Sequence, residues 1–424
     1  MRLALCTMSV AIAFVLALGP SVACATGAEG PKATPPPIDA PTSLPDAGPA
    51  DASDDRGAPT PSTCSESGFC YVPLPVLGPL LAVSASSADD AWMVPEESGV
   101  LLRWDGTSLT QAYAYSGASP SNITFARIWA KKKDVVWAVA QASDEQLFFV
   151  RYASPVGGGA PAFRELATQA SASAILSVWG QPAGDALWIV TDRGVLRVRE
   201  DAGGALVDDM SPPIGAEDTN QYSWRGVWGF GPDDIYVAGK VCPPDWCEPA
   251  DSRGVLAHYD GTSWSITTIE SASELLSLHG TAPGSERQLW YDSREPQLSS
   301  GPFGETIYVD MTYLVPVANE GQLGAPLYSR SMKDAPACAS RVGDMAAPSS
   351  GWFSGGLLVC HWTGTTFEPV KVALGERPIV EKVNGIWAGG EDDVWIVGAA
   401  VTRPGLPARG FAARRTKATA KGGQ

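Results

Sequence analysis

Six cysteines are the residues of this 424-residue chain whose spacing most clearly suggests chemistry. They fall into three local pairs: Cys64 with Cys70, Cys242 with Cys247, and Cys338 with Cys360. In an exported protein an even set of cysteines predicts disulfide bonds, and local pairing is the simplest of the arrangements that the sequence leaves open. Each of the first two bonds would close a very short loop and stabilise the fold by about 2 kcal/mol. The Cys242–Cys247 gap would also suit a metal, but no second Cys or His pair lies close by, so we expect none.

The remaining side chains give little support for catalysis. The chain has only 3 His, at His258, His279 and His361, and it lacks a nucleophile elbow, a metalloprotease motif and a phosphate loop. His258 and His361 occupy equivalent places in a repeat, which indicates a structural role. Two carboxylates could cleave a glycosidic bond, but the sequence places no two of them at a suitable distance. We therefore expect no catalytic residue, no metal and no cofactor.

The first 23 residues predict a secretory signal peptide. A single arginine is followed by an apolar stretch at 11–18, and the small residues 21–23 precede Cys24. This junction resembles a bacterial lipobox, which would make Cys24 the lipid-modified first residue, although serine stands where leucine is usual. The alternative is ordinary cleavage after Ala23 or Ala25, which would release a soluble protein.

Residues 24–63 predict a disordered tether. They consist mainly of Ala, Pro, Asp, Gly, Ser and Thr, with almost no large apolar side chain. Such a segment cannot bury enough surface to offset the entropy of ordering it. A tether behind a lipid-modified cysteine would suit a domain held at the outer membrane or cell surface. Without the lipid, the protein would be periplasmic or secreted.

A two-part repeat organises residues 64–416. Its first part is an apolar run with Trp, a polar turn with Asp, and a second apolar run with an aromatic residue, as in residues 226–237. Taking one apolar residue of this first part as equivalent in each copy, the spacing is about 45–50 residues with one long interval. These positions are taken as Val83, Ile128, Val178, Val227, Leu278, Val342 and Ile386.

The second part of the repeat is an alternating strand that ends in a tight turn, as in residues 254–262 with Asp260-Gly261. Asp-Gly between strand-like runs is a strong hairpin signal, since both residues can adopt positive φ. Each repeat thus predicts four short strands, as in one blade of a β-propeller. We predict an all-β propeller of seven four-stranded blades, with six as the alternative because the copy at Val342 is weak.

The two ends of the repeat region predict how the ring closes. The last copy ends at Gly410–Arg415 without an outer strand, and residues 417–424 form a basic tail. Phe69–Val76 precedes the first copy and has the character of an outer strand without a blade. We predict that it completes the last blade, with Pro73 and Pro75 on its unpaired edge.

The repeat resembles a known group of propellers. Val-Trp-Gly at 227–229, Asp-Asp at 233–234 and Tyr-Asp-Gly-Thr-Ser-Trp at 259–264 are similar to the Trp-Gly-rich β-propeller repeats of exported bacterial lipoproteins. The likeness to BNR/Asp-box and photosystem-assembly-factor-like propellers is looser, and neither a strict Asp-box nor a sialidase arginine triad can be placed. The resemblance covers about residues 69–416 and implies surface binding or scaffolding.

Several features bear on the partner. The net charge of −16 argues against nucleic acid, whose binding needs cations to neutralise phosphates. The recurring tryptophans predict packing between blades rather than a sugar-binding platform. Lys131–Lys133 replaces an acidic turn and predicts a solvated turn, or alternatively a docking point for an acidic partner. The acidic turns, such as Asp89-Asp90, predict backbone capping rather than calcium binding.

One insertion, Val241–Arg253, is a candidate recognition loop because it carries the Cys242–Cys247 pair together with Asp245, Trp246 and Glu248; an inert decoration is the alternative. A longer insertion, Pro296–Pro336, is a second candidate. We predict an exported, lipid-anchored propeller that acts as a non-catalytic binding or scaffolding module at the bacterial cell envelope, with an envelope protein or glycan as partner. The alternatives are a carbohydrate-binding or glycan-cleaving propeller and a structural envelope protein without a discrete ligand.

Overall fold

The computed structural model describes most of the chain after residue 63. The described residues are 64–415, except for 77, 98, 118–122, 156–157, 202–203, 214–219, 245–246, 248–250, 283–285, 299–305, 319–321, 332–341, 355–357, 373–379 and 401–407. The predicted signal peptide, Cys24, the tether and the basic tail therefore lie outside the described residues. So do Asp245, Trp246 and Glu248. The described residues all belong to one compact unit. Within them, no helix has the length and apolar character needed to span a membrane.

Seven antiparallel sheets of four strands make up this unit, and we number the blades in chain order. Blade 1 contains β2 (Leu80–Ser87), β3 (Asp90–Pro95), β4 (Val100–Trp104) and β5 (Leu109–Ala114), and blade 2 contains β6 (Ile123–Lys132), β7 (Val135–Ala142), β8 (Gln146–Ala153) and β9 (Ala162–Ser171). Blade 3 contains β10 (Ile175–Gly180), β11 (Ala186–Thr191), β12 (Gly194–Asp201) and β13 (Gly204–Asp209), and blade 4 contains β14 (Gln221–Gly231), β15 (Asp234–Cys242), β16 (Arg253–Tyr259) and β17 (Trp264–Ile269).

The remaining blades repeat this plan. Blade 5 contains β18 (Glu274–Gly280), β19 (Gln288–Leu298), β20 (Thr306–Pro316) and β21 (Tyr328–Ser331), and blade 6 contains β22 (Val342–Ala347), β23 (Ser350–Ser354), β24 (Val359–Trp362) and β25 (Phe367–Val370). Blade 7 contains β26 (Val380–Ala388), β27 (Val394–Ala400), β28 (Arg409–Arg415) and, as its outer strand, β1 (Phe69–Val72).

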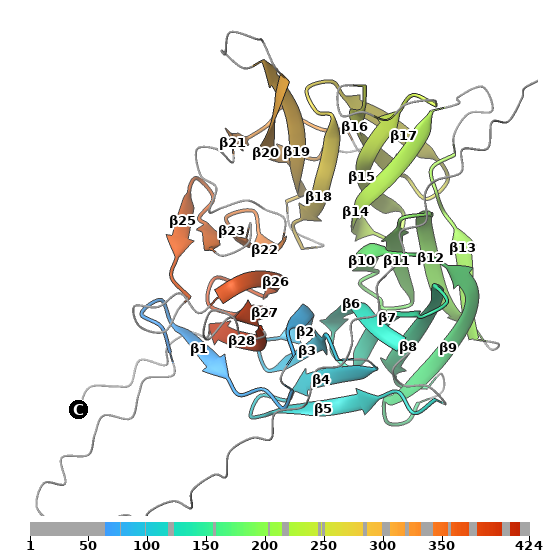
Figure 1. Cartoon of the computed structure of the whole chain (residues 1–424), viewed down its shortest axis with the longest axis vertical. Helices are drawn as coiled ribbons and strands as arrows, with labels where there is room; N and C mark the ends of the chain where they lie inside the picture. Colours follow the sequence, from blue (N-terminus) through green and yellow to red (C-terminus); the bar gives the residue numbers. More distant parts are fainter. Residues whose placement is uncertain are drawn as a thin grey trace, which may run out of the picture. The chain divides into compact units, whose positions relative to one another are not determined.

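The blades form a closed ring (Figure 1). The first strand of each blade contacts the first strand of the next, from β2 through β6, β10, β14, β18 and β22 to β26, and β26 contacts β2 again. This confirms the predicted seven-bladed propeller and excludes the six-bladed alternative. Because the ring is closed, every blade packs between two others, and no blade leaves a face of its sheet open to water.

An N-terminal strand completes the last blade, as predicted. β1 pairs antiparallel with β28, with Phe69 opposite Arg415 and Val72 opposite Ala412. The strand is shorter than expected, because it ends at Val72 and the two prolines at 73 and 75 follow it instead of lying within it. Proline lacks the N–H that a ladder needs, so the first of them ends the pairing.

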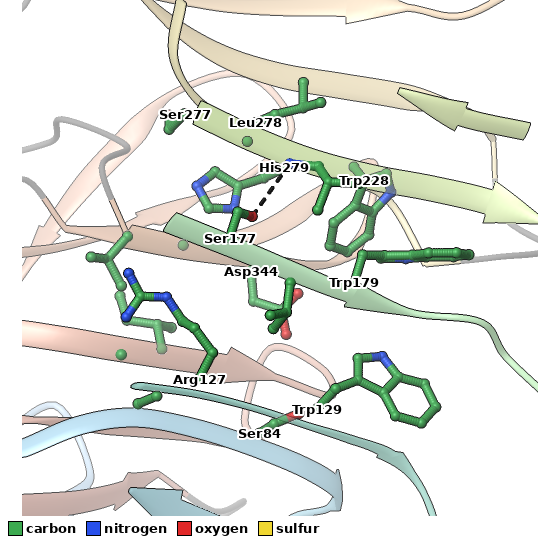
Figure 2. A pocket seen from close by; sticks show the side chains of 18 of the residues that line it. Ser84, Arg127, Trp129, Ser177, Trp179, Trp228, Ser277, Leu278, His279 and Asp344 are labelled. Carbon is green, nitrogen blue, oxygen red and sulfur yellow. Dashed lines mark hydrogen bonds between the residues drawn. The ribbon is translucent and has the colours of Figure 1, made fainter. Parts of the chain in front are cut away.

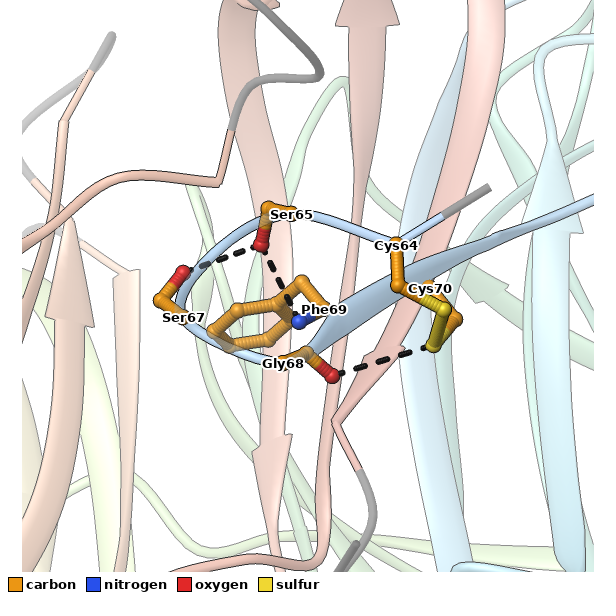
Figure 3. The surroundings of a disulfide bond; sticks show 6 residues. All are labelled: Cys64, Ser65, Ser67, Gly68, Phe69 and Cys70. Carbon is orange, nitrogen blue, oxygen red and sulfur yellow. Dashed lines mark hydrogen bonds between the residues drawn. A yellow bond between two sulfur atoms is a disulfide. The ribbon is translucent and has the colours of Figure 1, made fainter. Parts of the chain in front are cut away.

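A disulfide-closed loop holds the start of β1 (Figure 3). Cys64 is bonded to Cys70, and Ser65 accepts through its Oγ from the Phe69 N–H at 3.1 Å. The ring of Phe69 is fully buried and meets Trp352 of blade 6 edge to face at 5.6 Å. Elsewhere Cys242 is bonded to Cys247.

Only one cysteine of the third predicted pair lies among the described residues. Cys360 is disulfide-bonded, whereas Cys338 lies outside the described residues.

The Asp-Gly hairpins are present, but their turn differs from the expected one. Gly106 has φ +98° and Gly261 has φ +93°, whereas neither preceding Asp is among the described residues with positive φ. Instead Oδ1 of Asp105 accepts hydrogen bonds from the N–H groups of Thr107 and Ser108, both at 2.9 Å. These bonds hold the pKa of Asp105 at about 2, below its ordinary value. The loop is thus a four-residue Asx-type turn rather than a two-residue turn.

Blade 5 contains the longest hairpin and corrects one expectation. Gln288–Leu298 pairs with Thr306–Pro316 along eleven residues, from Gln288↔Pro316 to Leu298↔Thr306. The segment after Pro296, which we expected to be an insertion, therefore supplies regular strands of the blade. The sequence did not indicate these strands, because blade 5 has a weak Trp pattern and its strands continue past the point at which the strands of the other blades end.

The second and third strands of most blades share one cross-strand contact. In blade 1 Arg103 pairs with Trp92 and lies over its ring at 5.0 Å, and in blade 6 His361 pairs with Trp352 and stacks on it at 4.5 Å. His258 stacks on Tyr236 in the same way at 4.5 Å. These contacts give His258 and His361 the structural place that their positions in the repeat indicate.

Candidate functional site

The inner strands of all seven blades line a central cavity of about 250 Å³. Each inner strand except β22 contains a β-bulge at the start of its lining segment, for example between Phe125 and Arg127 in blade 2, whereas the bulge of β22 follows its lining residues. A bulge increases the local twist of a strand and re-aims its side chains. The repeated bulge thus presents equivalent residues of successive blades to the channel.

One position of the inner strand defines a ring of seven side chains. Its members lie opposite the aromatic residue of the second strand, as Trp129 lies opposite Trp137. They are Ser84, Trp129, Trp179, Trp228, His279, Asp344 and Trp387. Figure 2 shows six of them around the channel.

The register in blade 6 corrects the sequence alignment by one residue. Asp344 lies opposite Trp352, and Gly343 lies opposite Phe353. Gly343, and not Val342, is therefore the equivalent of Val83 and Ile386. Without a Trp in this copy the sequence offered no marker for the register, and Asp344 was missed as a channel residue.

The tryptophans of the ring pack on the glycine of the following blade. Trp129 lies over Gly180, and a Cβ at residue 180 would be only 2.5 Å from its Cε2 atom. Trp179 lies over Gly229 in the same way, and Trp228 over Gly280. These indoles are between 4 % and 8 % exposed. The recurring Trp-Gly pair therefore records contacts between blades, as the packing interpretation predicted.

Two polar residues take the place of a tryptophan and bond to the next blade instead. Ser84 Oγ accepts from the Ala130 N–H at 2.9 Å, and Asp344 Oδ2 accepts from the Ala388 N–H at 3.1 Å. In both cases the following blade has alanine where blades 3, 4 and 5 have glycine. An alanine is compatible here because no indole covers it.

Lys131 crosses the channel from blade 2 to blade 6. Its Nζ donates to Asp344 Oδ1 at 2.6 Å and lies 5.0 Å from the ring centre of Trp228. The side chain of Asp344 is only 5 % exposed, so the partner cation offsets the cost of burying its charge. Lys131 is thus engaged inside the ring, which corrects the expectation that it belongs to a solvated turn.

Arg127 is a second cation in the channel, and its bonds go to carbonyl groups. Its Nη1 donates to the Ala126 carbonyl at 2.9 Å and its Nη2 to the Leu176 carbonyl at 3.1 Å. Burial lowers the pKa of its guanidinium from the ordinary value. Among the described residues no carboxylate lies within ion-pair distance of it.

Other blades have small residues at the position of Arg127, and the contacts between blades explain why. Its equivalents include Ala82, Ser177, Gly226 and Gly385. A Cβ at Gly226 would lie 2.8 Å from the Leu278 nitrogen of the next blade, and Ser177 Oγ instead accepts from the Val227 N–H at 3.3 Å. The long side chain of Arg127 is therefore an exception in a place that otherwise serves tight contact between blades.

The charges of the lining leave one arginine uncompensated. Three permanent cations and one carboxylate line the described part of the cavity: Arg127, Lys131, Arg225 and Asp344. Lys131 is paired with Asp344, and Arg225 with Glu274 at 2.8 Å. A buried or half-buried charge without a counter-ion is costly and attracts an anion. The channel of this acidic chain thus carries local positive charge.

The acidic turns bind side-chain cations rather than capping backbone N–H groups. Asp90 bonds Arg103 of its own blade at 2.9 Å, and Asp89 bonds Arg414 of blade 7 at 2.6 Å. Within the described part of the chain, no three His, Cys, Asp or Glu side chains come together as a metal site would require. The predicted absence of a catalytic residue, a metal and a cofactor stays a prediction.

Comparisons with known proteins bear on the fold. No protein-family model matches the chain, and no curated protein matches its sequence. Among solved structures, the Cps50 (Swd1) β-propeller domain of Myceliophteria thermophila is similar with a TM-score of 0.55 and 12 % identity, over 82 % of this chain and 100 % of that one.

YCF48 from Cyanidioschyzon merolae has a TM-score of 0.52 and 14 % identity, over 82 % of this chain and 99 % of that one. YCF48 bound to D1 peptide has the same TM-score and identity, over 85 % of this chain and 100 % of that one. A streptogramin B lyase structure has a TM-score of 0.51 and 12 % identity, over 83 % of this chain and 100 % of that one. At such identities the likeness shows the fold alone, and the fold that it shows is the β-propeller.

Proposed function

We propose that the chain is an exported, lipid-anchored β-propeller that acts as a non-catalytic binding module at the bacterial cell envelope. Its partner is an envelope protein, and an acidic segment of that partner binds in the central channel. The observation that carries the proposal is Arg127, a guanidinium that lines the channel and bonds only carbonyl oxygens among the described residues. An aspartate, a glutamate or a terminal carboxylate would supply the missing counter-ion through charge-assisted hydrogen bonds.

Export is supported by the cysteines and by the first 63 residues. The bonds Cys64–Cys70 and Cys242–Cys247 need an oxidising compartment, and the signal-like segment and Cys24 fit a lipoprotein precursor. A protein partner is also compatible with the fold, because YCF48, a similar propeller, has been solved with a peptide bound.

The glycan-cleaving alternative has less support in the channel. It would need an acidic pocket with exposed tryptophans, whereas Asp344 is the only carboxylate of the described lining and Trp129, Trp179 and Trp228 are at most 8 % exposed.

Capture of partners from solubilised envelope tests the binding role. The full-length chain with a C-terminal tag serves as bait, with and without protease treatment of the envelope beforehand. We expect an acidic protein that is lost after protease treatment. Capture that survives the protease would refute the protein partner and favour a glycan or lipid headgroup.

An Arg127→Ser variant tests the channel. Serine occurs at this position in blade 3, so the variant removes the charge and keeps a side chain that the fold accommodates. We expect it to lose the partner, whereas Arg253→Ser, which removes an exposed cation of blade 4 paired with Glu270, keeps it. Equal capture by both variants would refute the channel as the site.

The mass of the mature N-terminus tests the anchor, since lipidation predicts acyl chains on Cys24 and an unmodified terminus would refute it.

A further inference from the structure

The junction between blades 1 and 2 is filled by four aromatic rings in its outer half. Trp92 of β3 meets Tyr152 of β8 at 5.4 Å and Phe163 of β9 at 5.8 Å. Tyr113 of β5 also meets Phe163, at 5.0 Å. Tyr152 and Phe163 are direct cross-strand partners, so one blade covers the Trp of the other with an aromatic pair.

Two other junctions use the same arrangement. Between blades 3 and 4, Trp188 is covered by the partners Tyr259 and Trp264 at 5.7 and 6.3 Å. Between blades 5 and 6, Trp290 is covered by the partners Trp362 and Phe367 at 5.1 and 5.5 Å. The outer residue of the covering pair is aromatic in all three cases.

The junction between blades 7 and 1, where the ring closes, lacks two of these rings. Trp104 covers Trp395 at 5.5 Å, but its cross-strand partner is Leu109. Val72 of β1 stands where blade 1 has Tyr113. Tyr113 lies opposite the residue two positions before Arg103, and Val72 lies opposite the residue two positions before Arg414, the equivalent of Arg103 in blade 7. Two aliphatic side chains thus replace two rings on facing walls of one junction.

A cavity of about 400 Å³ occupies this place, and Leu109, Val72, Trp104, Tyr71 and Arg414 are among its lining residues. Its volume is in the range of small-molecule sites, roughly 300–1,000 Å³. Figure 1 shows the strands that form it, with β1 of the closing blade beside β4 and β5 of blade 1. The other junctions act as an internal template, because they show that an aromatic ring fits between these strands.

The charge of the pocket lining determines which aromatic ligands it favours. Arg414 is the only charged residue of the described lining, and its guanidinium lies 5.7 and 5.8 Å from the ring centres of Trp104 and Trp395. Its Nη2 donates to Asp89, whose side chain is 71 % exposed. An exposed carboxylate of this kind is an exchangeable partner, so a ligand carboxylate can take its place on the guanidinium.

We propose that the pocket between blades 7 and 1 binds a small planar aromatic carboxylate. The ring takes the volume that Phe163 fills in the next junction, and the carboxylate bonds Arg414. This site is separate from the central channel and does not depend on the proposed function, because it involves the outer half of the ring and a different ligand chemistry.

Ligand-observed NMR and calorimetry on the full chain test the proposal with indole-3-acetate, indole and tryptamine as probes. We expect indole-3-acetate to bind with a Kd of about 1 mM, the value for a ligand of this size with ordinary efficiency. Neutral indole binds more weakly and the cationic tryptamine most weakly, because the guanidinium distinguishes the three charges. No binding of indole-3-acetate at several times this concentration, or the reverse order of the probes, would overturn the proposal.

Two substitutions locate the site. Leu109→Phe fills the pocket with the ring that blade 2 has at this position, and should weaken indole-3-acetate at least tenfold without loss of stability. Leu206→Phe is the control, because it adds the same ring to the outer strand of blade 3 at a position that lies opposite Arg199 and is 40 % exposed. Asp89→Asn removes the competing carboxylate and should strengthen binding several-fold. Unchanged affinity in Leu109→Phe, measured on a variant that unfolds like the parent, would show that the probe binds elsewhere.

Discussion

The contact between Trp129 and Gly180 makes a sharp test of how the blades are joined. An added Cβ at residue 180 would lie 2.5 Å from Cε2 of the indole, whereas ordinary contacts are roughly 3.4–4 Å, so one of the two must move by about 1 Å. Overpacking of this kind costs about 1–3 kcal/mol. We expect Gly180→Ala to lower the free energy of unfolding by that amount.

The same substitution should behave oppositely once the indole is removed. Trp129→Ser copies the arrangement of blade 1, in which Ser84 faces Ala130, and by itself costs about 3–5 kcal/mol through lost burial. In that background Gly180→Ala meets no ring and removes a glycine from a strand, which favours folding by about 0.5–1 kcal/mol. The two effects differ in sign, so the coupling energy of the pair is about 1.5–4 kcal/mol.

Urea unfolding followed by tryptophan fluorescence and circular dichroism measures all four proteins, with the midpoints compared at a common slope. Gly231→Ala is the matched control, because a Cβ there meets nothing within 4 Å, so the substitution should change the stability by the same small amount in both backgrounds. If Gly180→Ala has the same cost with and without the indole, then the Trp-Gly contact does not explain the repeat and this reasoning fails.

Three further outcomes follow from individual contacts. Asp344→Ala removes the acceptor of the Ala388 N–H and should lower the stability by about 2–4 kcal/mol in urea unfolding, whereas Asp344→Ser keeps an acceptor and should cost about half as much; equal costs would contradict the role of the N–H bond. Cys70→Ser should lower the stability by about 2 kcal/mol in non-reducing buffer and have no effect in reductant, and a loss in both would point to another cause. The pKa of Asp105 is held at about 2, below its ordinary 3.8, so its contribution to stability is complete above pH 4 and is lost as the pH falls through 2. Asp105→Asn should therefore differ from the parent at pH 5 and converge with it near pH 2 in unfolding curves, and a constant difference would refute the assignment.

The repeat was predictable from the sequence because it depends on contacts that every blade makes. Trp at the inner-strand position recurs in blades 2, 3, 4 and 7 and Asp-Gly at the hairpin in blades 1 and 4, and together with the weaker copies they favoured seven blades over six and the pairing of β1 with β28. Blade 6 shows where this fails, since it has Asp344 in place of Trp and its register was displaced by one residue. Ala388 gave no signal of the change, because blade 1 has Ala85 at the same position although blade 7 before it carries Trp387.

The channel charges were not predictable in the same way. Lys131 and Asp344 belong to blades 2 and 6, and only the closed ring brings them within 2.6 Å. Periodicity relates equivalent positions of neighbouring blades, whereas this contact joins non-equivalent positions across the ring. Arg127 was missed because its place in the strand is unremarkable until the small residues of the other blades are aligned with it.

The closing strand also has a consequence for the order in which the domain can form. β1 is the first described strand and pairs with the last, so blade 7 stays a three-stranded sheet with an open edge until the rest of the ring has formed. Closing so long a loop in a flexible chain would cost about 5 kcal/mol of entropy. Packing of the blades reduces that cost, because each blade that packs on its neighbour shortens the distance between β28 and β1. Ring closure should therefore be the late, slow step of folding, and blocking β1 should leave six blades paired and the seventh exposed to aggregation.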